Sequence, residues 1–445
     1  MRSTFWTAAA VVLAGCGGGG ASDPSGSGEA PPSVILVSVD TLRADHLGLY
    51  GYGRDTSPYL DRLADECLVF DRAYTTAAWT LVAHMSMMTG LEPEEHGVVQ
   101  PNLALSPEVP PVAVRLREAG YRTIGFYSGS WVEPRYGFDR GFDVYRGYDT
   151  PEEARAAVGE ALAEHNPARP LFLFLHIFDV HTAPFTPDFR GFYDPPEPYD
   201  TQFIADARER LAHVDCRSVW DGKGRPLNDD EVEALVALYD GGVRHADAML
   251  SDWVEGWRAD GLLDRSLLLI TSDHGESLGQ RGRVGGHGGM YEEGLRIPLM
   301  VRFPDGHRAG EREPGVVSVV DFAPTFLEIA GLSAEPWRSG HSLRLPPLPE
   351  RVVRAQRALV GGTWKLNQTG AERLAFNLAE DAGEVAPYSV ESEEMRAAIR
   401  DLRRRYEEQL AARAPLPGQA VELRELDEAT RAELRNLGYA GELGD

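Results

Sequence analysis

Residues 33–48 read SVILVSVDTLRADHLG, and this stretch indicates the architecture of the chain. The run from Val34 to Val39 is apolar and rich in β-branched residues, a pattern typical of a strand that is buried on both faces. It ends at Asp40. Strands of this kind belong mainly to parallel sheets that are covered by helices on both sides.

The sequence on either side of this stretch alternates between helical and strand patterns. Helices are predicted for residues 57–70, 112–120, 151–165 and 229–261, and strands for 121–128, 171–179 and 266–276. Such alternation predicts an α/β fold, a three-layer α/β/α sandwich with a mostly parallel central sheet spanning residues 33–342.

The pattern changes from about Leu343. Short strands in 351–370 and 372–381 and an amphipathic helix in 393–414 predict a smaller C-terminal α+β subdomain, residues 343–414. Residues 415–445 read as a tail with a short helical piece at 429–441.

The N-terminus reads MRSTFWTAAAVVLAGC, one positive charge followed by an apolar run too short to span a bilayer. We expect residues 1–15 to be an export signal. Residues 13–16 resemble the lipobox of bacterial lipoproteins, which implies cleavage before Cys16 and lipid on that cysteine. Residues 16–32 form a Gly/Ser-rich tether of the kind an anchored domain needs. The protein is therefore expected in the periplasm or at the cell surface, anchored to a membrane. The alternative interpretation of residues 1–16 is an ordinary signal peptide with an incidental cysteine.

The charge balance excludes one class of partner. Asp and Glu number 69 and Lys and Arg 44, a net charge of −25, so the basic footprint of a nucleic-acid-binding protein is absent. Lysine occurs only at Lys223 and Lys365, which leaves most cationic roles to arginine and histidine. Cys67 is expected to be a buried apolar residue, and whether it pairs with Cys216 stays open.

Polar residues stand at the ends of three predicted strands. Asp40 follows the first strand, His176 ends the second with Asp179 and His181 in the loop after it, and Asp273 and His274 follow the third. The carboxyl ends of parallel strands lie at one edge of a sheet, so these side chains are expected to converge. Asp40, Asp273 and His274 form an oxygen-rich set with one imidazole, which suits a divalent cation.

A hydroxyl residue, Thr80, opens the predicted helix in WTLVAHMSMMTG, residues 79–90. A helix N-terminus favours an anion, and a hydroxyl beside a cation loses its proton more easily. Thr80 is therefore predicted to be a nucleophile, with helix capping as a secondary role.

Five segments resemble the sulfatases, a family of the alkaline phosphatase superfamily. They are SVILVSVDTLRADHLGLYGYGRDTSPYLDRLADECLVFDRAY, WTLVAHMSMMTGLEPEEHGV, LLLITSDHGESLGQRGRVGGHGGMYEEGLRIPLMVRFP, SVVDFAPTFLEIAGL and FNLAEDAGE, in the expected order between residues 33 and about 385.

The resemblance implies a role for each matching position. It implies one divalent metal ion (Ca, Mg, Mn or Zn) on Asp40, Thr80, Asp273 and His274, with Thr80 as nucleophile. His84 falls where sulfatases carry the arginine of their signature, His181 matches a histidine that binds the transferred group, and His287 falls near a cationic position that serves the leaving group.

The chain departs from the family at several of these positions. Sulfatases oxidise a cysteine or serine to formylglycine, and threonine cannot give that aldehyde, so no formylglycine is expected at Thr80. Val82 and Ala83 replace the Pro and Ser of the signature, Thr41 replaces a second aspartate, and residues 125–128 read GFYS where many sulfatases have Gly-Lys-Trp-His.

Three functions stay open. The first is hydrolysis of a sulfate or phosphate ester by Thr80 and one metal ion. The second is a phospho-group transferase or phosphodiesterase acting on envelope glycans or lipids, and the third is a non-catalytic binding protein with the same fold. A second metal on Asp240, Asp247, His245 and His287 is not favoured, because a helix could simply present Asp240 and Asp247 to solvent.

Overall fold

The structure is a computed structural model that describes residues 30–182, 192–220, 222–285, 289–347, 350–369, 372–389 and 392–423. The predicted export signal, Cys16, His287 and the helical piece at 429–441 lie outside these residues. Among the described helices, none combines the length and the apolar character that a membrane span requires.

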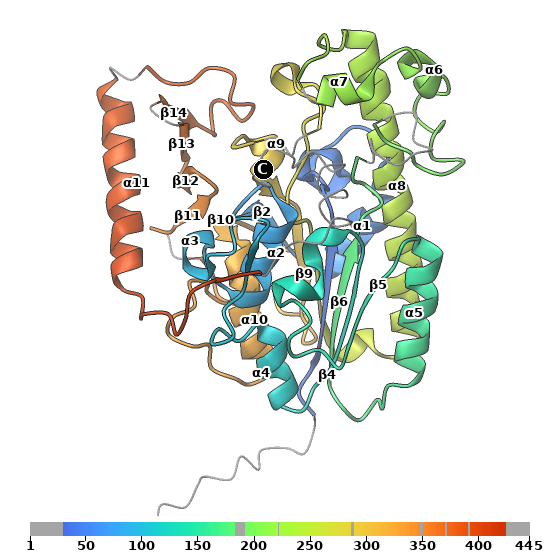
Figure 1. Cartoon of the computed structure of the whole chain (residues 1–445), viewed down its shortest axis with the longest axis vertical. Coiled ribbons are helices and arrows are strands. Elements are labelled where there is room, and N and C mark those ends of the chain that lie inside the picture. Colours follow the sequence, from blue (N-terminus) through green and yellow to red (C-terminus); the bar gives the residue numbers. More distant parts are fainter. Residues whose placement is uncertain are drawn as a thin grey trace, which may run out of the picture. The chain divides into compact units, whose positions relative to one another are not determined.

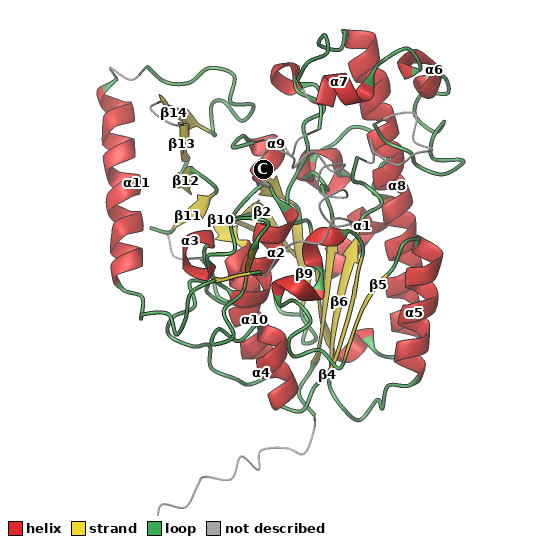
Figure 2. Ribbon diagram, in the orientation of Figure 1, coloured by secondary structure: helices red, strands yellow, loops and turns green. Residues whose placement is uncertain are grey.

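The described residues contain a nine-stranded sheet in the order β10-β2-β9-β7-β1-β6-β4-β5, with β8 paired to β2 (Figures 1 and 2). The strand β1 (Ser33–Val39) lies inside it, parallel to β6 (Leu171–Ile177) on one side and to β7 (Ser266–Thr271) on the other. Strands β4 (Arg122–Tyr127) and β5 (Val144–Gly147) continue the parallel part, and β9 (Leu299–Arg302) is antiparallel to β7. The mostly parallel sheet is confirmed.

Side chains of β1 alternate between two apolar cores. Ile35, Val37 and Val39 face a core shared with α1 (Pro58–Leu63), α5 (Pro151–Ala163) and α8 (Asp229–Ala259). Val34 and Leu36 face the opposite core, shared with α2 (Thr80–Thr89), α4 (Val112–Glu118) and α10 (Phe322–Ile329). Helices therefore cover both faces of the sheet, which is the predicted three-layer sandwich.

One predicted helix is wrong in part. Residues 57–70 were expected to be helical throughout, but α1 ends at Leu63, a short 3-10 turn covers Ala64–Glu66, and β2 begins at Leu68 and runs to Tyr74. The buried run Leu68–Phe70 pairs with β9 and β10 (Arg312–Ser318). Periodicity does not distinguish a short buried strand from the end of a buried helix.

The C-terminal part is a small antiparallel sheet with one long helix. Its strands are β11 (Val352–Ala355), β12 (Ala358–Gly361), β13 (Trp364–Thr369) and β14 (Glu372–Asn377), in that order. The helix α11 (Glu393–Ala411) packs Met395, Leu402 and Tyr406 against this sheet. An α+β C-terminal subdomain is therefore present, and the boundary at residue 343 stays a prediction.

The remaining described elements are short. They are α3 (Pro93–His96), β3 (Leu103–Ala104), α6 (Ala207–Leu211), α7 (Cys216–Trp220), α9 (Glu292–Leu295), β8 (Arg296–Ile297) and β15 (Val421–Glu422), which pairs with β3. Cys67 is buried, as predicted, and both Cys67 and Cys216 are free thiols.

Candidate active site

Three neighbouring strands bring the predicted site residues together. Ser38 of β1 pairs in register with His176 of β6 and with Thr271 of β7. Asp40 and Asp273 stand just beyond the ends of β1 and β7, so all three strands deliver a polar side chain to one edge of the sheet. His176 Nε2 lies 3.1 Å from Asp40 Oδ2. The predicted convergence is therefore observed for Asp40, His176 and Asp273, whereas Asp179 lies 3.8 Å from His245.

Asp40, Asp273 and His274 form a compact, fully buried group. Each offers one ligand atom, and these atoms lie within 4.8 Å of one another. His274 Nε2 is 3.4 Å from Asp273 Oδ2 and 3.9 Å from Asp40 Oδ1. Asp40 Oδ1 and Asp273 Oδ2 have no hydrogen-bond partner among the described residues. Two buried carboxylates with orphaned oxygens fit a cation, because a buried carboxylate without a partner is costly.

The two carboxylates differ in their electrostatic surroundings. Burial, followed by the charge of Asp40, raises the pKa of Asp273 to about 6. Burial also opposes ionisation of Asp40, but His181 and the hydrogen bond with His176 hold the pKa of Asp40 below its ordinary value. Mutual repulsion of this kind is the usual property of a carboxylate pair at a cation site.

Thr41, predicted to stand where the sulfatases have a second aspartate, holds Asp273 through its backbone. Its N–H donates to Asp273 Oδ1 over 3.2 Å, and its φ of 55° lies in the left-handed region, which is costly for a threonine. The amide of His274 donates to the same oxygen over 2.8 Å. These two bonds occupy Oδ1 and leave Oδ2 of Asp273 facing the site.

Thr80 is the first residue of α2 and its hydroxyl faces the carboxylate group. Its Oγ1 donates to Asp40 Oδ2 over 3.4 Å and lies 3.3 Å from His274 Nε2. The N-cap residue is Trp79, and no side chain caps this helix end. The predicted capping role of Thr80 is therefore wrong, because its hydroxyl points to the site instead of back to its own helix.

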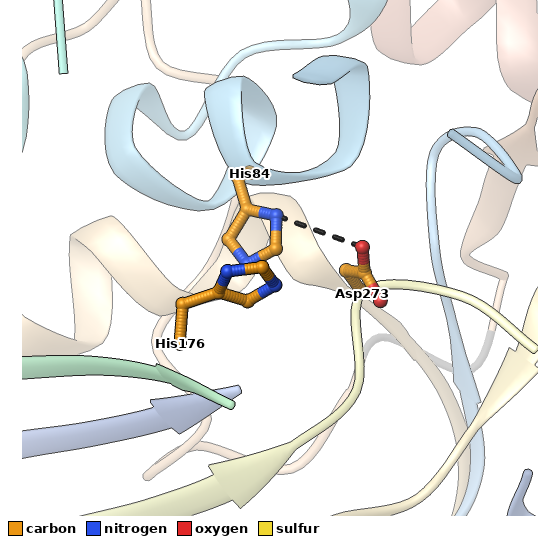
Figure 3. Close-up of side chains that lie close together, drawn as sticks. All are labelled: His84, His176 and Asp273. Atoms are coloured by element: carbon orange, nitrogen blue, oxygen red, sulfur yellow. Dashed lines mark ion pairs between the residues drawn. The ribbon is translucent and has the colours of Figure 1, made fainter. Parts of the chain in front are cut away.

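His84 lies one turn further along α2 and points toward His176 and Asp273, with its Nδ1 3.7 Å from Asp273 Oδ2 (Figure 3). Its Nδ1 donates to the Thr80 carbonyl over 2.9 Å, and its Nε2 lies 3.0 Å from the Ser38 hydroxyl. Burial lowers the pKa of His84 well below its ordinary value, so the ring is neutral. A neutral ring with both nitrogens engaged does not replace the charge of the family's arginine.

Of the two remaining predicted site histidines, His181 is among the described residues and His287 is not. His181 stacks on Phe178 with ring centroids 4.3 Å apart, and its Nδ1 donates to the Thr182 carbonyl. It is close enough to Asp40 for each charge to shift the pKa of the other group. His287 is outside the described residues, so its role at the leaving group stays a prediction.

The expectation that α8 presents Asp240 and Asp247 to solvent is wrong, because both are buried. Asp240 accepts hydrogen bonds from Tyr52 and Arg54 and lies 2.7 Å from His46 Nδ1. Asp247 accepts from two backbone amides at the start of α1. These carboxylates hold α8 to neighbouring segments, and His245 lies 3.8 Å from Asp179 instead.

Sequence reasoning placed His176 at a strand end but gave it no role. It is fully buried and contacts Asp40 directly, and its Nδ1 donates to the Ser128 carbonyl over 2.9 Å. The available signal was a single polar residue inside the apolar strand LFLFLHI. Ser38, the one polar residue within VILVSV, carried the same signal and lies 3.0 Å from His84.

Comparison with known proteins identifies the family. The sulfatase family model matches residues 32–332. An N-acetylglucosamine-6-O-sulfatase of Bacteroides thetaiotaomicron is 23% identical over 417 residues, which cover 76% of this chain and 73% of the relative. An extracellular sulfatase SULF-1 homolog of Drosophila melanogaster is 25% identical over 413 residues, 80% of this chain but only 35% of that longer protein.

The fold is shared with solved structures. The phosphonate monoester hydrolase of Agrobacterium radiobacter superposes with a TM-score of 0.65 at 19% identity, over 86% of this chain and 95% of the other. The family model spans every strand of the nine-stranded sheet, and this match leads to one conclusion. The chain belongs to the sulfatase family of ester hydrolases.

Proposed function

We propose that this chain hydrolyses a sulfate or phosphate-type ester, with Thr80 as nucleophile and one divalent cation on Asp40, Thr80, Asp273 and His274. The observation that carries the proposal is the position of the Thr80 hydroxyl, 3.4 Å from Asp40 Oδ2 and 3.3 Å from His274 Nε2. A hydroxyl at a helix N-terminus and beside a carboxylate pair has the surroundings that nucleophilic attack on an anionic ester requires.

The donor set fits a cation, because Asp40 Oδ1 and Asp273 Oδ2 are buried and lack hydrogen-bond partners among the described residues. When bound there, a divalent cation acts as a Lewis acid on the ester oxygens and favours the deprotonated form of a neighbouring hydroxyl. The carboxylates and the His274 imidazole suit Mg, Ca, Mn or Zn.

The residues of this chain account for the rest of the reaction. Oγ1 of Thr80 forms a bond to sulfur or phosphorus as the bond to the leaving oxygen breaks. The proton that the Thr80 hydroxyl loses is passed to the departing oxygen, which leaves as the alcohol. Water then cleaves the covalent ester, which returns the Thr80 hydroxyl and releases free sulfate or phosphate. His181, next to Asp40, would orient the group that is transferred.

The proposed substrates are sulfated or phosphorylated glycans or lipids of the envelope. The relatives named above include a glycan sulfatase and a phosphonate monoester hydrolase, so both sulfur and phosphorus esters are reasonable. An unmodified threonine favours the phosphorus esters, and a phospho-group transferase or phosphodiesterase would share the same Thr80 intermediate.

One observation favours a non-catalytic binding protein instead. Lys365 is fully buried and pairs with Glu292 and Glu384 at 2.9 and 3.1 Å, so it is engaged away from the ester site. The lysine of the Gly-Lys-Trp-His segment, whose place here is residues 125–128, is therefore not replaced by Lys365.

A substrate panel with two matched variants tests the proposal. Sulfate esters, phosphate mono- and diesters and phosphonates would be incubated with wild type, Thr80→Ala and Thr89→Ala. Thr89 ends the same helix and its hydroxyl donates to the Met85 carbonyl over 2.6 Å, away from the carboxylates. Thr80→Ala should lose turnover by several orders of magnitude and Thr89→Ala should keep it. A binding protein would bind the esters and turn over none.

We also propose that Cys16 carries lipid and anchors the domain to a membrane after export. The lipobox-like residues 13–16 and the Gly/Ser-rich tether support this. Cys16→Ser should release the protein from carbonate-washed membranes. Retention of the Cys16→Ser protein in those membranes would place the anchor elsewhere.

A further inference from the structure

The turn that follows Asp40 is held in a costly backbone conformation. Thr41 has a φ of 55°, in the left-handed region, which a β-branched residue keeps only where its surroundings enforce it. Its own hydroxyl is buried and has no hydrogen-bond partner among the described residues, so the Thr41 side chain does not hold the turn. The conformation therefore depends on what other segments do to the backbone of this turn.

Three successive amides of the turn are each bound by a side chain from another segment. The Thr41 amide donates to Asp273 Oδ1 over 3.2 Å, and the Leu42 amide donates to the Ser272 hydroxyl over 2.9 Å. The Arg43 amide donates to a hydroxyl on α8, that of Tyr239, over 2.9 Å. Two of the three partners thus belong to the segment that carries Asp273, and the third comes from the helix layer.

The Tyr239 hydroxyl bonds both sides of the turn at once. It accepts from the Arg43 amide and donates to the Thr41 carbonyl over 2.8 Å, which uses its single proton. Tyr239 is fully buried on α8, the long helix on one face of the sheet (Figure 1). Its ring packs edge-on against those of His46 and Tyr193, with centroids 5.0 and 5.3 Å away. The packing of the ring fixes the position of the hydroxyl.

Ser272 and Arg43 join this turn to the segment that follows β7. The Ser272 hydroxyl donates to the His274 carbonyl over 2.6 Å. The Arg43 guanidinium donates to the Glu276 carbonyl over 3.0 Å. A shift of the turn is therefore passed on to Asp273 and His274.

We propose that Tyr239 is a positioning residue for the carboxylate pair, whose hydroxyl holds residues 41–43 so that the free oxygens of Asp40 and Asp273 face one cation. This rests on the proposed function only for the presence of that cation. Without the hydroxyl, the two backbone groups that it bonds lose their buried partner, and Thr41 is free to leave the left-handed region. The Thr41 amide then moves off Oδ1 of Asp273, and that carboxylate is no longer held in one orientation.

Equilibrium dialysis of the full chain against Mg²⁺, Ca²⁺, Mn²⁺ or Zn²⁺ tests the proposal with the ion that wild type binds most tightly. Tyr239→Phe should raise the Kd for that ion about 10- to 100-fold, the usual effect of losing an outer partner of a metal ligand. Tyr193→Phe is the matched control, because its buried hydroxyl has no hydrogen-bond partner among the described residues, and it should leave the Kd unchanged. An unchanged Kd in Tyr239→Phe, or equal losses in both variants, would overturn the proposal.

A Thr41→Gly background distinguishes positioning from a general loss of packing. Glycine adopts the left-handed region without strain, so the turn has little reason to relax when the Tyr239 hydroxyl is removed. In that background Tyr239→Phe should raise the Kd by less than about threefold, a clear departure from additivity. An equal increase in both backgrounds would contradict the proposal, because a packing defect on α8 does not depend on the residue at position 41.

Two further points keep the outcomes separate. Ser272→Ala removes the partner of the Leu42 amide and should also raise the Kd, so it carries the test if Tyr239→Phe does not fold. None of these measurements needs turnover. A protein whose metal affinity depends on the Tyr239 hydroxyl but which hydrolyses no ester would refute the proposed function and keep this inference. Turnover through Thr80 with a Kd that is independent of this hydroxyl would do the reverse, and a wild type that binds none of the four ions would overturn this inference.

Discussion

Replacing Asp273 by asparagine should stabilise the metal-free protein and destabilise the metal-loaded one relative to wild type. Burial and the charge of Asp40 raise the pKa of Asp273 from 3.8 to about 6. In the unfolded chain the group ionises near its ordinary pKa, so wild-type stability is complete below pH 3.8 and falls as the pH rises through about 6. The shift corresponds to about 3 kcal/mol above that pH.

Asparagine removes the free-energy cost of ionising the buried carboxyl, and it changes the shape of the side chain little. Its Oδ1 can still accept from the amides of Thr41 and His274, which bond Asp273 Oδ1 at 3.2 and 2.8 Å. Its amide nitrogen takes the place of Oδ2, near His274 Nε2, where it can donate. In chelator at pH 8, Asp273→Asn should therefore be more stable to urea by about 3 kcal/mol, and the difference should vanish near pH 4.

Added metal should reverse the order. An ion at 1,000 times its Kd stabilises wild type by about 4.1 kcal/mol, which exceeds the about 3 kcal/mol that the variant gains without metal, while the variant has lost a ligand and gains little from metal. The urea midpoint of each protein is measured in four conditions, with chelator or with metal and at pH 8 or pH 4. A variant that is less stable than wild type in chelator at pH 8, or that gains as much from metal, would refute the account of the carboxylate pair.

Three further changes test other parts of the molecule. Burial raises the pKa of Glu92 from 4.5 to about 8. The unfolding free energy of wild type should therefore fall by up to about 5 kcal/mol between pH 4.5 and pH 8, and that of Glu92→Gln should not. The same pH dependence of urea unfolding in both proteins would contradict this. Lys365→Met leaves Glu292 and Glu384 without their buried cation and should lower the unfolding free energy by about 3–5 kcal/mol. The control Lys223→Met, at an exposed lysine, should lower it by less than about 0.5 kcal/mol. Equal urea midpoints for the two variants would show that the buried ion pairs contribute nothing. His84→Ala should lower kcat roughly 100-fold, far less than loss of the nucleophile, because the ring holds the Thr80 carbonyl and Ser38 and approaches Asp273 Oδ2 only to 3.7 Å. A loss as large as that of Thr80→Ala would give His84 a direct role.

The sheet and its helices could be predicted because their signals are local. The run Val34–Val39 is apolar throughout most of its length, and its side chains alternate between two cores as a doubly covered strand requires. The helical prediction for 57–70 failed at Leu68, where an apolar run of three residues fits either a helix end or a strand. Only the pairing of β2 with β9 and β10, which are distant in sequence, decides between them.

The candidate site was predictable where position along a strand fixes direction. Asp40 and Asp273 follow adjacent parallel strands, so their convergence follows from topology. The direction in which each side chain points within the cluster does not follow from topology. Thr80 faces Asp40 instead of capping α2, and His176 contacts Asp40 because Ser128, on the neighbouring connection, accepts its other N–H. Those contacts join segments far apart in the chain, and no local pattern encodes them.

The most direct test of the central claim is peptide mass mapping of protein that has been rapidly quenched during its first turnover of an ester from the panel. If Thr80 is the nucleophile, the peptide that contains it should carry a sulfo or phospho group at early times and lose it as the intermediate is hydrolysed, and Thr89→Ala should behave in the same way. Consumption of one equivalent of ester with the Thr80 peptide unmodified at every quench time, or with the group on another residue, would contradict the account.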